Sequence, residues 1–487
     1  MSESLEFPCR LHIAGGWVNA ASGRTLSILN PADHGEVASV PCGGADEASA
    51  AVAAATQALP GWRATPAPAR GDCLRRLHDL LIAHREPLAS LLTLEQGKPL
   101  PQARAEVDYA ASFYLWYAEE ARRICGFTIP HREAGKTAMV EYQPVGVIAA
   151  ITPWNFPLAM GAKKIAAALA AGCTAVWKPS EETPLMALAT AWLAARAGLP
   201  AGVLNVVFGD AAAIGERWME EAAVRALSFT GSTRTGLLLL RQAAATLKRV
   251  QLELGGNAPF IVLEDADLDL ASEDFMKLKF LVSGQVCVTA NRLLVQRRIE
   301  EEFTHRLTER LRALRIGPGL EEGVEVGPLI NEAGVKKVES LVEDACRSGA
   351  RLLYSADLPP ALDRSCFYPP TLLAGVNQNQ RIAREEIFGP VVAMQAFASE
   401  EEALTRANDT EYGLAAYVYS RDVERATELA RRIEAGIVGV NDPRPLRAEV
   451  PFGGIKMSGF GREGGREGLM EFLECRVIGV RRAPRAK

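Results

Sequence analysis

The apolar and polar positions between residues 145 and 254 follow a regular alternation. Short apolar runs, rich in Val, Ile, Ala and Leu, are separated by longer stretches with apolar residues at helical spacing. Such alternation predicts βαβ units and a parallel sheet, with right-handed crossovers. Thr183 is expected to cap one of the helices, with Pro184 at its first position. The strands are expected at residues 145–151, 173–178, 203–208, 226–229 and 250–254.

The flanking segments show weaker versions of the two patterns. Helical spacing covers residues 46–59 and 70–124, and two strands are expected at 127–129 and 137–142. A second mixed α/β segment spans residues 258–442. It contains strands at 259–263, 292–296, 391–397 and 416–419, and charged helices at 299–314, 332–348 and 422–435. The tail contains one more strand, at 476–481.

Polar residues and glycines gather where the predicted parallel strands end. Open parallel sheets bind ligands in the crevice outside the carboxyl ends of their strands. We therefore expect a ligand site at this edge. The residues concerned are Asn155, Lys178, Gly209, Gly231, Ser232 and Glu253.

Bulk properties narrow the class of protein. A chain of 487 residues is expected to form at least two large domains. A net charge of −5 favours neither nucleic acid nor an anionic membrane as partner. No apolar run reaches the ~18 residues of a membrane helix, and we expect no signal peptide. Nine scattered cysteines without a C-x-x-C pair indicate a reducing, cytoplasmic setting, and scattered histidines indicate no metal site.

Seven short motifs then occur in an order that resembles the aldehyde dehydrogenase superfamily. The resemblance extends from about residue 10 to residue 480, and three further segments are most similar to the succinate-semialdehyde dehydrogenases. The seven motifs are TPWNFP (152–157), KPSE (178–181), FTGS (229–232), ELGG (253–256), GQVC (284–287), EIFGP (386–390) and PFGG (451–454). The three segments are ELGGNAPFIV (253–262), ANR (290–292) and NDTEYGLAAY (408–417).

The resemblance implies an α/β fold in three parts, with strands that assemble a homodimer or homotetramer. It contains a Rossmann-like parallel-sheet NAD-binding domain, an α/β catalytic domain and a small β oligomerisation extension. The expected boundaries are 1–125 and 146–254 for the NAD-binding domain, 255–442 for the catalytic domain, 126–145 and 469–487 for the oligomerisation strands, and 443–468 for a return segment near substrate and cofactor.

The resemblance also implies NAD(P)-dependent oxidation of an aldehyde to an acid. A thiolate must add to the aldehyde, because a hydride leaves more readily from a carbon that carries an oxyanion. Cys287 is the expected nucleophile, and loss of hydride converts its thiohemiacetal into a thioester. The Asn155 amide and the Cys287 backbone N–H are expected to hold the oxyanion, and Glu253 to activate the hydrolytic water.

A dinucleotide is expected along the same edge, without a G-x-G-x-x-G fingerprint. A carboxylate at Glu181 would accept from the adenosine ribose and repel a 2′-phosphate, so NAD is expected to be preferred over NADP. Ser232 is expected at the pyrophosphate, and Glu386 and Phe388 at the nicotinamide riboside. The full expected set is Ile151, Thr152, Pro153, Trp154, Lys178, Glu181, Gly209, Gly231, Ser232, Leu254, Glu386 and Phe388.

The substrate side departs from the succinate-semialdehyde pattern, in which three positions bind the substrate carboxylate. Those positions hold Lys163, Leu281 and Leu446, and only the first is charged. Arg444 and Arg447 are nearby in sequence and suit an anionic group. One hypothesis is therefore a short anionic aldehyde held by Lys163 with one of these arginines.

Three other readings stay open. The first is a broad-specificity enzyme for neutral aldehydes, with an apolar funnel formed by Phe156, Phe280, Leu281 and Leu446. The second is a CoA-acylating relative, against which the retained Glu253 weighs, because that base serves hydrolysis. The third is a non-catalytic relative, which the presence of Cys287, Asn155 and Glu253 disfavours.

Overall fold

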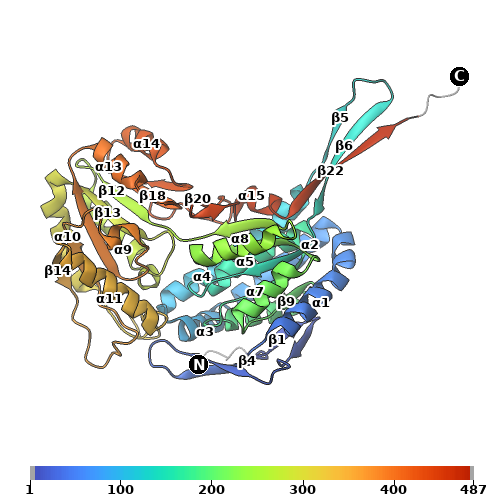
Figure 1. Cartoon of the computed structure of the whole chain (residues 1–487), viewed down its shortest axis with the longest axis horizontal. Coiled ribbons are helices and arrows are strands. Elements are labelled where there is room, and N and C mark those ends of the chain that lie inside the picture. Colours follow the sequence, from blue (N-terminus) through green and yellow to red (C-terminus); the bar gives the residue numbers. More distant parts are fainter. Residues whose placement is uncertain (1–5, 483–487) are drawn as a thin grey trace.

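Two sheets, each packed with helices, form the body of the molecule, and a three-stranded arm extends from it (Figure 1). The computed structural model describes residues 6–482. The first sheet and its helices contain most of the N-terminal half of the chain, and the second sheet contains segments from 258 to 440. This arrangement confirms the α/β fold class expected from the sequence.

The first sheet has eight strands in the order β2-β1-β9-β8-β7-β10-β11-β21. The five from β9 to β11 are parallel, while β1 and β21 add antiparallel strands at either side. The chain builds outward from β7 in one direction and then resumes at β10 on its other side. The carboxyl ends of β7 and β10 therefore form the switch point at which such sheets bind ligands. The bounds are β1 (Leu11–Ile13), β2 (Gly16–Val18), β7 (Val147–Ile151), β8 (Thr174–Lys178), β9 (Leu204–Val206), β10 (Val224–Thr230), β11 (Arg249–Glu253) and β21 (Gly459–Phe460).

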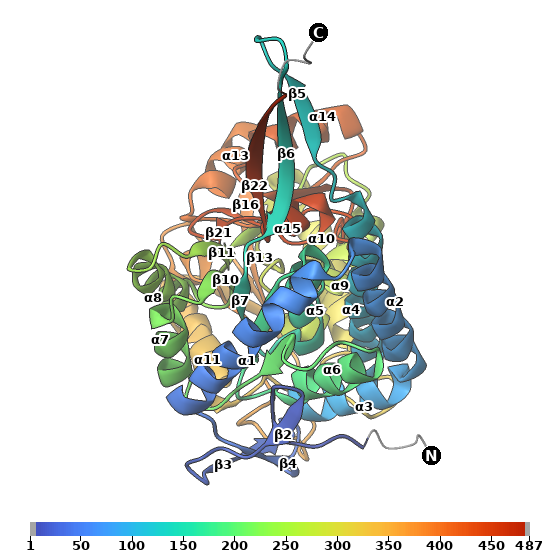
Figure 2. The same ribbon diagram turned by 90° about the vertical axis from the view of Figure 1, so that its right-hand side faces the viewer.

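Helices cover both faces of the first sheet (Figure 2). One face packs mainly against α1 (Ala45–Ala64), α7 (Ala211–Glu220) and α8 (Thr233–Ala244). The other packs mainly against a five-helix layer with the Ala-rich α5 at its centre, in which every residue is buried. That layer contains α2 (Ala67–Ala83), α3 (Arg85–Gln96), α4 (Leu100–Glu120), α5 (Pro157–Ala171) and α6 (Leu185–Arg196). The short α15 (Gly465–Met470) contacts α5, and a 3₁₀ turn, η1 (Ala121–Arg123), follows α4.

The second sheet has seven strands in the order β14-β15-β16-β13-β12-β18-β19, and only β14 is antiparallel to its neighbour. As in the first sheet, the chain adds strands outward from β12 in one direction and then resumes at β18 on the other side of β12. The switch point therefore lies between β12 and β18. The strands are β12 (Ala258–Val262), β13 (Ala290–Gln296), β14 (Arg351–Ser355), β15 (Thr371–Ala374), β16 (Val391–Phe397), β18 (Ala415–Tyr419) and β19 (Ile437–Val440).

Further helices complete this second unit, packed in three apolar clusters. They are α9 (Leu268–Lys279), α10 (Glu300–Ala313), α11 (Glu332–Arg347), α12 (Arg381–Arg384), α13 (Glu400–Asn408) and α14 (Val423–Arg432), with η2 (Leu281–Gly284) and η3 (Arg297–Ile299). Two small antiparallel pairs remain, β3 (Thr25–Leu29) with β4 (Glu36–Pro41), and β17 (Tyr412–Gly413) with β20 (Ile455–Lys456).

The arm consists of β5 (Phe127–Pro130), β6 (Lys136–Pro144) and β22 (Leu473–Arg481), paired antiparallel with β6 in the middle (Figure 2). It contains the strands expected within 126–145 and 469–487, although residues 469–470 belong to α15 and residues 483–487 lie outside the described chain. Large apolar side chains on it are exposed, namely Phe127, Ile129, Val477 and Val480.

Two sequence predictions about helices are wrong in detail. The run predicted over 70–124 is three helices, because Gly97 adopts a left-handed conformation (φ 90°) that ends α3, and a break at His84 separates α2 from α3. Thr183 does not cap α6, which begins one residue later than expected, after Pro184. The carboxylate of Glu95 accepts from the first two amides of that helix instead, at 2.9 and 3.1 Å. A carboxylate distant in sequence thus takes the place of a local cap.

Among the described residues, no helix is long and apolar enough to cross a membrane. The nine cysteines, which all fall within residues 6–482, are unpaired. No cluster of three or more potential metal ligands occurs in that part of the chain.

Candidate active site

The expected catalytic residues meet where the carboxyl edge of the first sheet faces the amino edge of the second. Glu253 ends β11, and the loop of Asn155 follows β7. Cys287 lies just before β13. Gly256 joins the two edges, because a Cβ at this position would collide with the carbonyl oxygen of Cys287.

Cys287 is half-buried in a loop with unusual backbone geometry. Val282 and Ser283 have positive φ values of 49° and 55°, which cost free energy in residues other than glycine. Gly284 is also left-handed, and a side chain there would collide with the backbone of Gly389. Burial, together with the charges of Glu386 and Glu253, raises the pKa of the Cys287 thiol to about 12, although Lys163 opposes them. The resting residue is therefore a thiol that needs a base before it can attack.

Asn155 is buried and directed at the cysteine loop. Its Nδ2 donates to the carbonyl of Gln285 at 2.8 Å, two residues before Cys287. The side chain of Gln285 is itself held, since its Oε1 accepts from the backbone of Ile330 at 2.9 Å. An amide has two N–H groups, so one remains for an oxygen bound at the sulfur.

Glu253 is buried beside a second carboxylate, Glu463. Burial and the charge of Glu463 raise the pKa of Glu253 well above its ordinary value, and Lys164 and Lys163 partly oppose this. Lys164 forms a buried ion pair with Glu463, and the Lys163 Nζ lies 3.8 Å from the same carboxylate. Within the described residues, neither carboxylate oxygen of Glu253 has a hydrogen-bond partner. A buried acid left in this state is suited to exchange protons with a bound reactant or water.

The expected cofactor residues lie along the carboxyl edge. Lys178, at the end of β8, forms an ion pair with Glu181 and also donates to the carbonyl of Pro179 at 3.2 Å. Ser232 caps α8 by accepting from the amide of Thr235 at 3.2 Å, which orients the helix N-terminus toward the edge. Such a terminus provides free N–H groups and a partial positive charge for a phosphate. Among the other expected residues, Ile151, Thr152 and Leu254 are buried, Pro153 and Trp154 are half-buried, Gly209 is left-handed (φ 133°), and Gly231 donates to the carbonyl of Glu253.

Glu386 and Phe388 reach this edge from the second unit. Phe388 has a positive φ of 58° and meets the ring of Trp154 edge-on, with 5.5 Å between centroids. The Glu386 carboxylate accepts from the amide of Gly256 at 3.2 Å. Burial raises the pKa of Glu386 to about 7, against the opposing effects of Lys337, the Gly256 amide and Lys279. A buried carboxylate facing a cluster of glycines fits the hydroxyls of a ribose.

The aldehyde dehydrogenase family model matches residues 17–478. The chain belongs to the aldehyde dehydrogenase family. It is 48% identical over 479 residues to succinate-semialdehyde dehydrogenase [NADP(+)] GabD of Escherichia coli, covering 98% of this chain and 99% of that protein. It is also 48% identical over 466 residues to a 3-sulfolactaldehyde dehydrogenase of Pseudomonas putida, covering 96% of both chains.

A solved structure shows the same likeness. The succinate-semialdehyde dehydrogenase of Burkholderia pseudomallei superimposes with a TM-score of 0.95 at 48% identity, covering 97% of this chain and 98% of that one. The chain is therefore an NAD(P)-dependent oxidoreductase that acts on an aldehyde.

The substrate side of this dehydrogenase is apolar around the sulfur. Phe156, Leu281 and Leu446 pack with Cys287 against one apolar cluster, which also contains Phe280 and Phe452. The four residues of the expected apolar funnel thus belong to one packed cluster, and Phe452 is an additional member.

Lys163 is the charged group of that wall, and it is fully buried. Its Nζ lies 3.7 Å from the centroid of Phe452, and the rings of Phe113 and Tyr109 lie 5.7 and 5.8 Å away. Despite its burial, nearby negative groups, among them Glu463, raise the pKa of Lys163 above its ordinary value. The amine is therefore a cation in an aromatic cage.

The two arginines are placed differently. Arg444 is exposed and donates to the carbonyl of Lys277 at the end of α9, 3.3 Å away. Arg447 is exposed as well. Arg444 lines a pocket together with Phe280 and Leu281, and a clamp formed by Lys163 with Arg444 or Arg447 around a bound anion stays a prediction.

Sequence reasoning missed the charged residues that support the site. Glu463 pairs with Lys164, and a second buried pair, Lys98 with Glu106, lies behind Asn155. One signal was present: adjacent lysines at 163 and 164 interrupt an otherwise apolar helix. Two buried ammonium groups require counter-charges, so an acid from elsewhere in the chain had to be present.

Proposed function

We propose that the enzyme oxidises a short aldehyde with an anionic group at its far end to the corresponding acid, with Cys287 as nucleophile. The observation that supports this best is the buried Lys163 cation on the wall next to Cys287. The names of the relatives agree, because succinate semialdehyde and 3-sulfolactaldehyde carry a carboxylate and a sulfonate.

We assign the first proton transfer to Glu253. Its carboxylate has no hydrogen-bond partner among the described residues, and its raised pKa makes it a stronger base than an ordinary carboxylate. Once it has taken the thiol proton, the sulfur adds to the aldehyde carbon, and the oxyanion accepts from the Asn155 amide and the Cys287 N–H. A nicotinamide held beside Glu386 and Phe388 would supply the acceptor for the hydride.

Glu253 also serves the second half of the reaction. After hydride loss, the acyl group is a thioester on Cys287. Glu253, once it has released the thiol proton to solvent, takes a proton from the water that attacks the thioester and returns it to the departing sulfur. The acid leaves, and the thiol is restored. The buried ion pair of Glu463 and Lys164 lies next to Glu253 and provides charged groups with which Glu253 can exchange that proton.

We further propose that NAD is preferred over NADP. Glu181, paired with Lys178 at the end of β8, supports a ribose diol and opposes a 2′-phosphate. The E. coli relative is named for NADP, so the two enzymes would differ here. Comparing kcat/KM for the two cofactors in wild type and Glu181→Ser tests this: NAD should lead in wild type, and the variant should gain on NADP. A wild type that prefers NADP contradicts the assignment.

The arm is proposed to assemble a homodimer or homotetramer. Its exposed apolar side chains on strands with open edges support pairing with a second chain. A cytoplasmic location is part of the same proposal and is supported by the nine unpaired cysteines. Residues 6–125 and 146–254 would then be the NAD-binding domain, 255–442 the catalytic domain, and 443–468 the return segment between them.

A second candidate is an enzyme for neutral aldehydes. It is favoured by the Glu463 carboxylate, which already lies 3.8 Å from Lys163, and by the apolar wall of Phe156, Leu281 and Leu446. In that case Lys163 serves Glu463 rather than a substrate.

Matched substrates separate the two candidates. Reduced cofactor is measured without CoA for succinate semialdehyde and for butyraldehyde, which has the same length but no charge. Our proposal expects the anion to lead in kcat/KM by about 10–100-fold, the value of one charge-assisted hydrogen bond. Lys163→Met should remove that preference and spare butyraldehyde. A wild type that prefers butyraldehyde supports the neutral candidate, and a requirement for CoA excludes both.

A further inference from the structure

We infer that Lys98 is a positioning residue for the oxyanion hole, acting through the backbone of Asn155. Lys98 lies in the turn between α3 and α4, and its side chain is fully buried. Its Nζ donates to the Asn155 carbonyl at 2.7 Å and lies 4.3 Å from the centroid of the Phe156 ring. The inference rests on the proposed role of Asn155.

The charge of Lys98 is balanced by Glu106, in the second turn of α4. The two form an ion pair, and the Glu106 carboxylate also accepts from the amides of Leu158 and Ala159 at 3.0 and 3.2 Å. These amides belong to the first turn of α5. The pair therefore holds the chain on both sides of Phe156: at the carbonyl before it and at the helix after it.

Fixing the Asn155 carbonyl fixes the direction of its side chain. The peptide plane after Asn155 is rigid, so an anchored carbonyl determines ψ of Asn155 and, with the helix cap, the position of its Cα. Its Nδ2 must reach the Cys287 loop, where it now donates to Gln285. A displacement of about 1 Å at a reacting centre can cost about 10²-fold in rate.

The same segment also holds the other half of the site. Gln102, four residues after Lys98, accepts from the amide of Val282 at 2.8 Å and donates to the carbonyl of Glu325 at 3.1 Å. Val282 is one of the strained residues that lead to Cys287. Residues 98–102 thus contact both the backbone of Asn155 and the loop that leads to Cys287, and they fix the position of one relative to the other.

Stability alone does not explain this arrangement. A buried ion pair contributes little net stability compared with apolar residues of the same size. Glu106 neutralises the charge of Lys98. The additional hydrogen bond from Lys98 to the Asn155 carbonyl is not needed for charge balance, and we assign it to positioning Asn155. A purely structural Lys98 would affect kcat independently of Asn155, and a positioning Lys98 would not.

The test is a double-mutant cycle that keeps the interior neutral. Lys98→Met with Glu106→Gln removes both charges together and leaves Gln an oxygen for the α5 amides. This pair of changes is made in wild type and in Asn155→Ala, and kcat, KM and Tm are measured. Lys248→Met is the matched control, because Lys248 is also buried and donates to two carbonyls, Glu221 and Val224, far from the site.

We expect the neutral pair to lower kcat by about 10²-fold, with little change in cofactor KM. In the Asn155→Ala background the same changes should cost less than about threefold, while Lys248→Met should leave kcat unchanged in both backgrounds. If the two losses multiply, Lys98 does not act through Asn155 and the inference is wrong. If Asn155→Ala alone leaves kcat intact, the proposed oxyanion hole fails and the inference with it.

A second variant covers the case in which the neutral pair does not fold. Lys98→Arg keeps the charge for Glu106, but its wider guanidinium cannot leave the Asn155 carbonyl in place. It should fold and show the same non-additive loss with Asn155→Ala. Full activity in Lys98→Arg contradicts the inference.

Discussion

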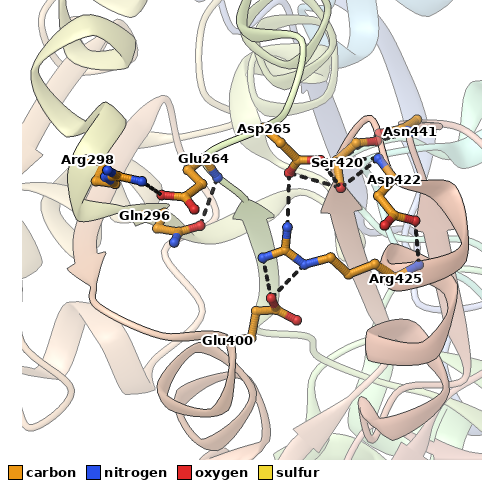
Figure 3. Close-up of polar contacts among 9 residues, drawn as sticks. All are labelled: Glu264, Asp265, Gln296, Arg298, Glu400, Ser420, Asp422, Arg425 and Asn441. Atoms are coloured by element: carbon orange, nitrogen blue, oxygen red, sulfur yellow. Dashed lines mark hydrogen bonds and ion pairs between the residues drawn. The ribbon is translucent and has the colours of Figure 1, made fainter.

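The two sheets have the same winding but use their carboxyl edges differently. Each has a switch point beside the first of its parallel strands, which is β7 in one sheet and β12 in the other. At the first, Glu253 is buried and neither of its oxygens has a partner among the described residues. At the second, Asp265 accepts from the Ser420 hydroxyl at 2.8 Å and the Asp422 amide at 3.2 Å, and it lies 3.6 Å from Arg425 (Figure 3).

The remaining side chains of the second edge are matched in the same way. Arg425 also binds Glu400, and Glu264 forms an ion pair with Arg298 at 3.1 Å. The backbone amide of Glu264 donates a hydrogen bond to the side-chain oxygen of Gln296 at 2.8 Å (Figure 3). The comparison teaches that topology supplies a crevice, whereas unsatisfied groups convert it into a reaction site. The charged side chains described at the carboxyl edge of the second sheet are paired with one another, whereas Glu253 at the edge of the first sheet is free to interact with a ligand.

Replacing the nucleophile should have the largest effect. Cys287→Ala should lower kcat by more than about 10³-fold, because no thioester can form. Reduced cofactor formation measures it. Cys346→Ala, at an exposed cysteine, is the control and should keep full activity. Substantial turnover by Cys287→Ala would mean that another group attacks the aldehyde.

Carboxylates at equivalent ends of the two sheets allow a matched comparison. Glu253→Gln should lower steady-state turnover by about 10²–10⁴-fold and should also slow the release of the first equivalent of reduced cofactor, because the same carboxylate takes the thiol proton before hydride transfer. Glu264→Gln, just after β12, should leave kcat unchanged. Rapid-mixing kinetics measures the first turnover, and an equal effect of both changes would erase the distinction between the edges.

Cofactor affinity should depend on pH through Glu386. Its pKa of about 7 means that the carboxyl is protonated at pH 6 and ionised at pH 8. The ionised form accepts more strongly from ribose hydroxyls, so the Kd of NADH should rise about 5–10-fold as pH falls across this range. Fluorescence titration measures it, and Glu386→Gln should show a flat profile. A pH-dependent Kd in that variant would assign the titration to another group.

The smallest effect is expected at the second edge. Asp265→Asn should leave kcat unchanged and cost about 1 kcal/mol of stability, or about 1 °C in Tm for a chain of this length. Hydrogen bonds from Ser420 and Asp422, with Arg425, hold the pKa of Asp265 below its ordinary value against the effect of burial. Its contribution is therefore complete above pH ~4 and lost as pH falls through the lowered pKa. Thermal scans across this range measure it; a Tm difference that grows on acidification would contradict it.

The sequence was sufficient for features that repeat locally. The strands and helices from 145 to 254 were recognisable because buried parallel strands are continuous apolar runs. Asn155 and Glu253 could be placed at strand ends for the same reason. Short strands such as β1 and β14, with only three to five residues, were missed because so few positions show no clear period.

Long-range polar contacts could not be predicted. Lys98 meets Asn155 across 57 positions, and Lys164 meets Glu463 across 299. The Glu95 carboxylate caps α6 from 90 positions away, which is why Thr183 was wrongly assigned. Nothing in a local window indicates which acid neutralises which buried lysine.

The most direct test of the account is the mass of the enzyme trapped during turnover. Glu253→Gln, in which both acylation and hydrolysis should be slow, is incubated with NAD and succinate semialdehyde until one equivalent of NADH per site has formed, then quenched in acid, digested and analysed by peptide mass spectrometry. We predict an acyl group, added as a thioester, on the peptide that contains Cys287 and on no other cysteine peptide. An unmodified Cys287 peptide in enzyme that has released its equivalent of NADH would contradict the covalent mechanism at this edge.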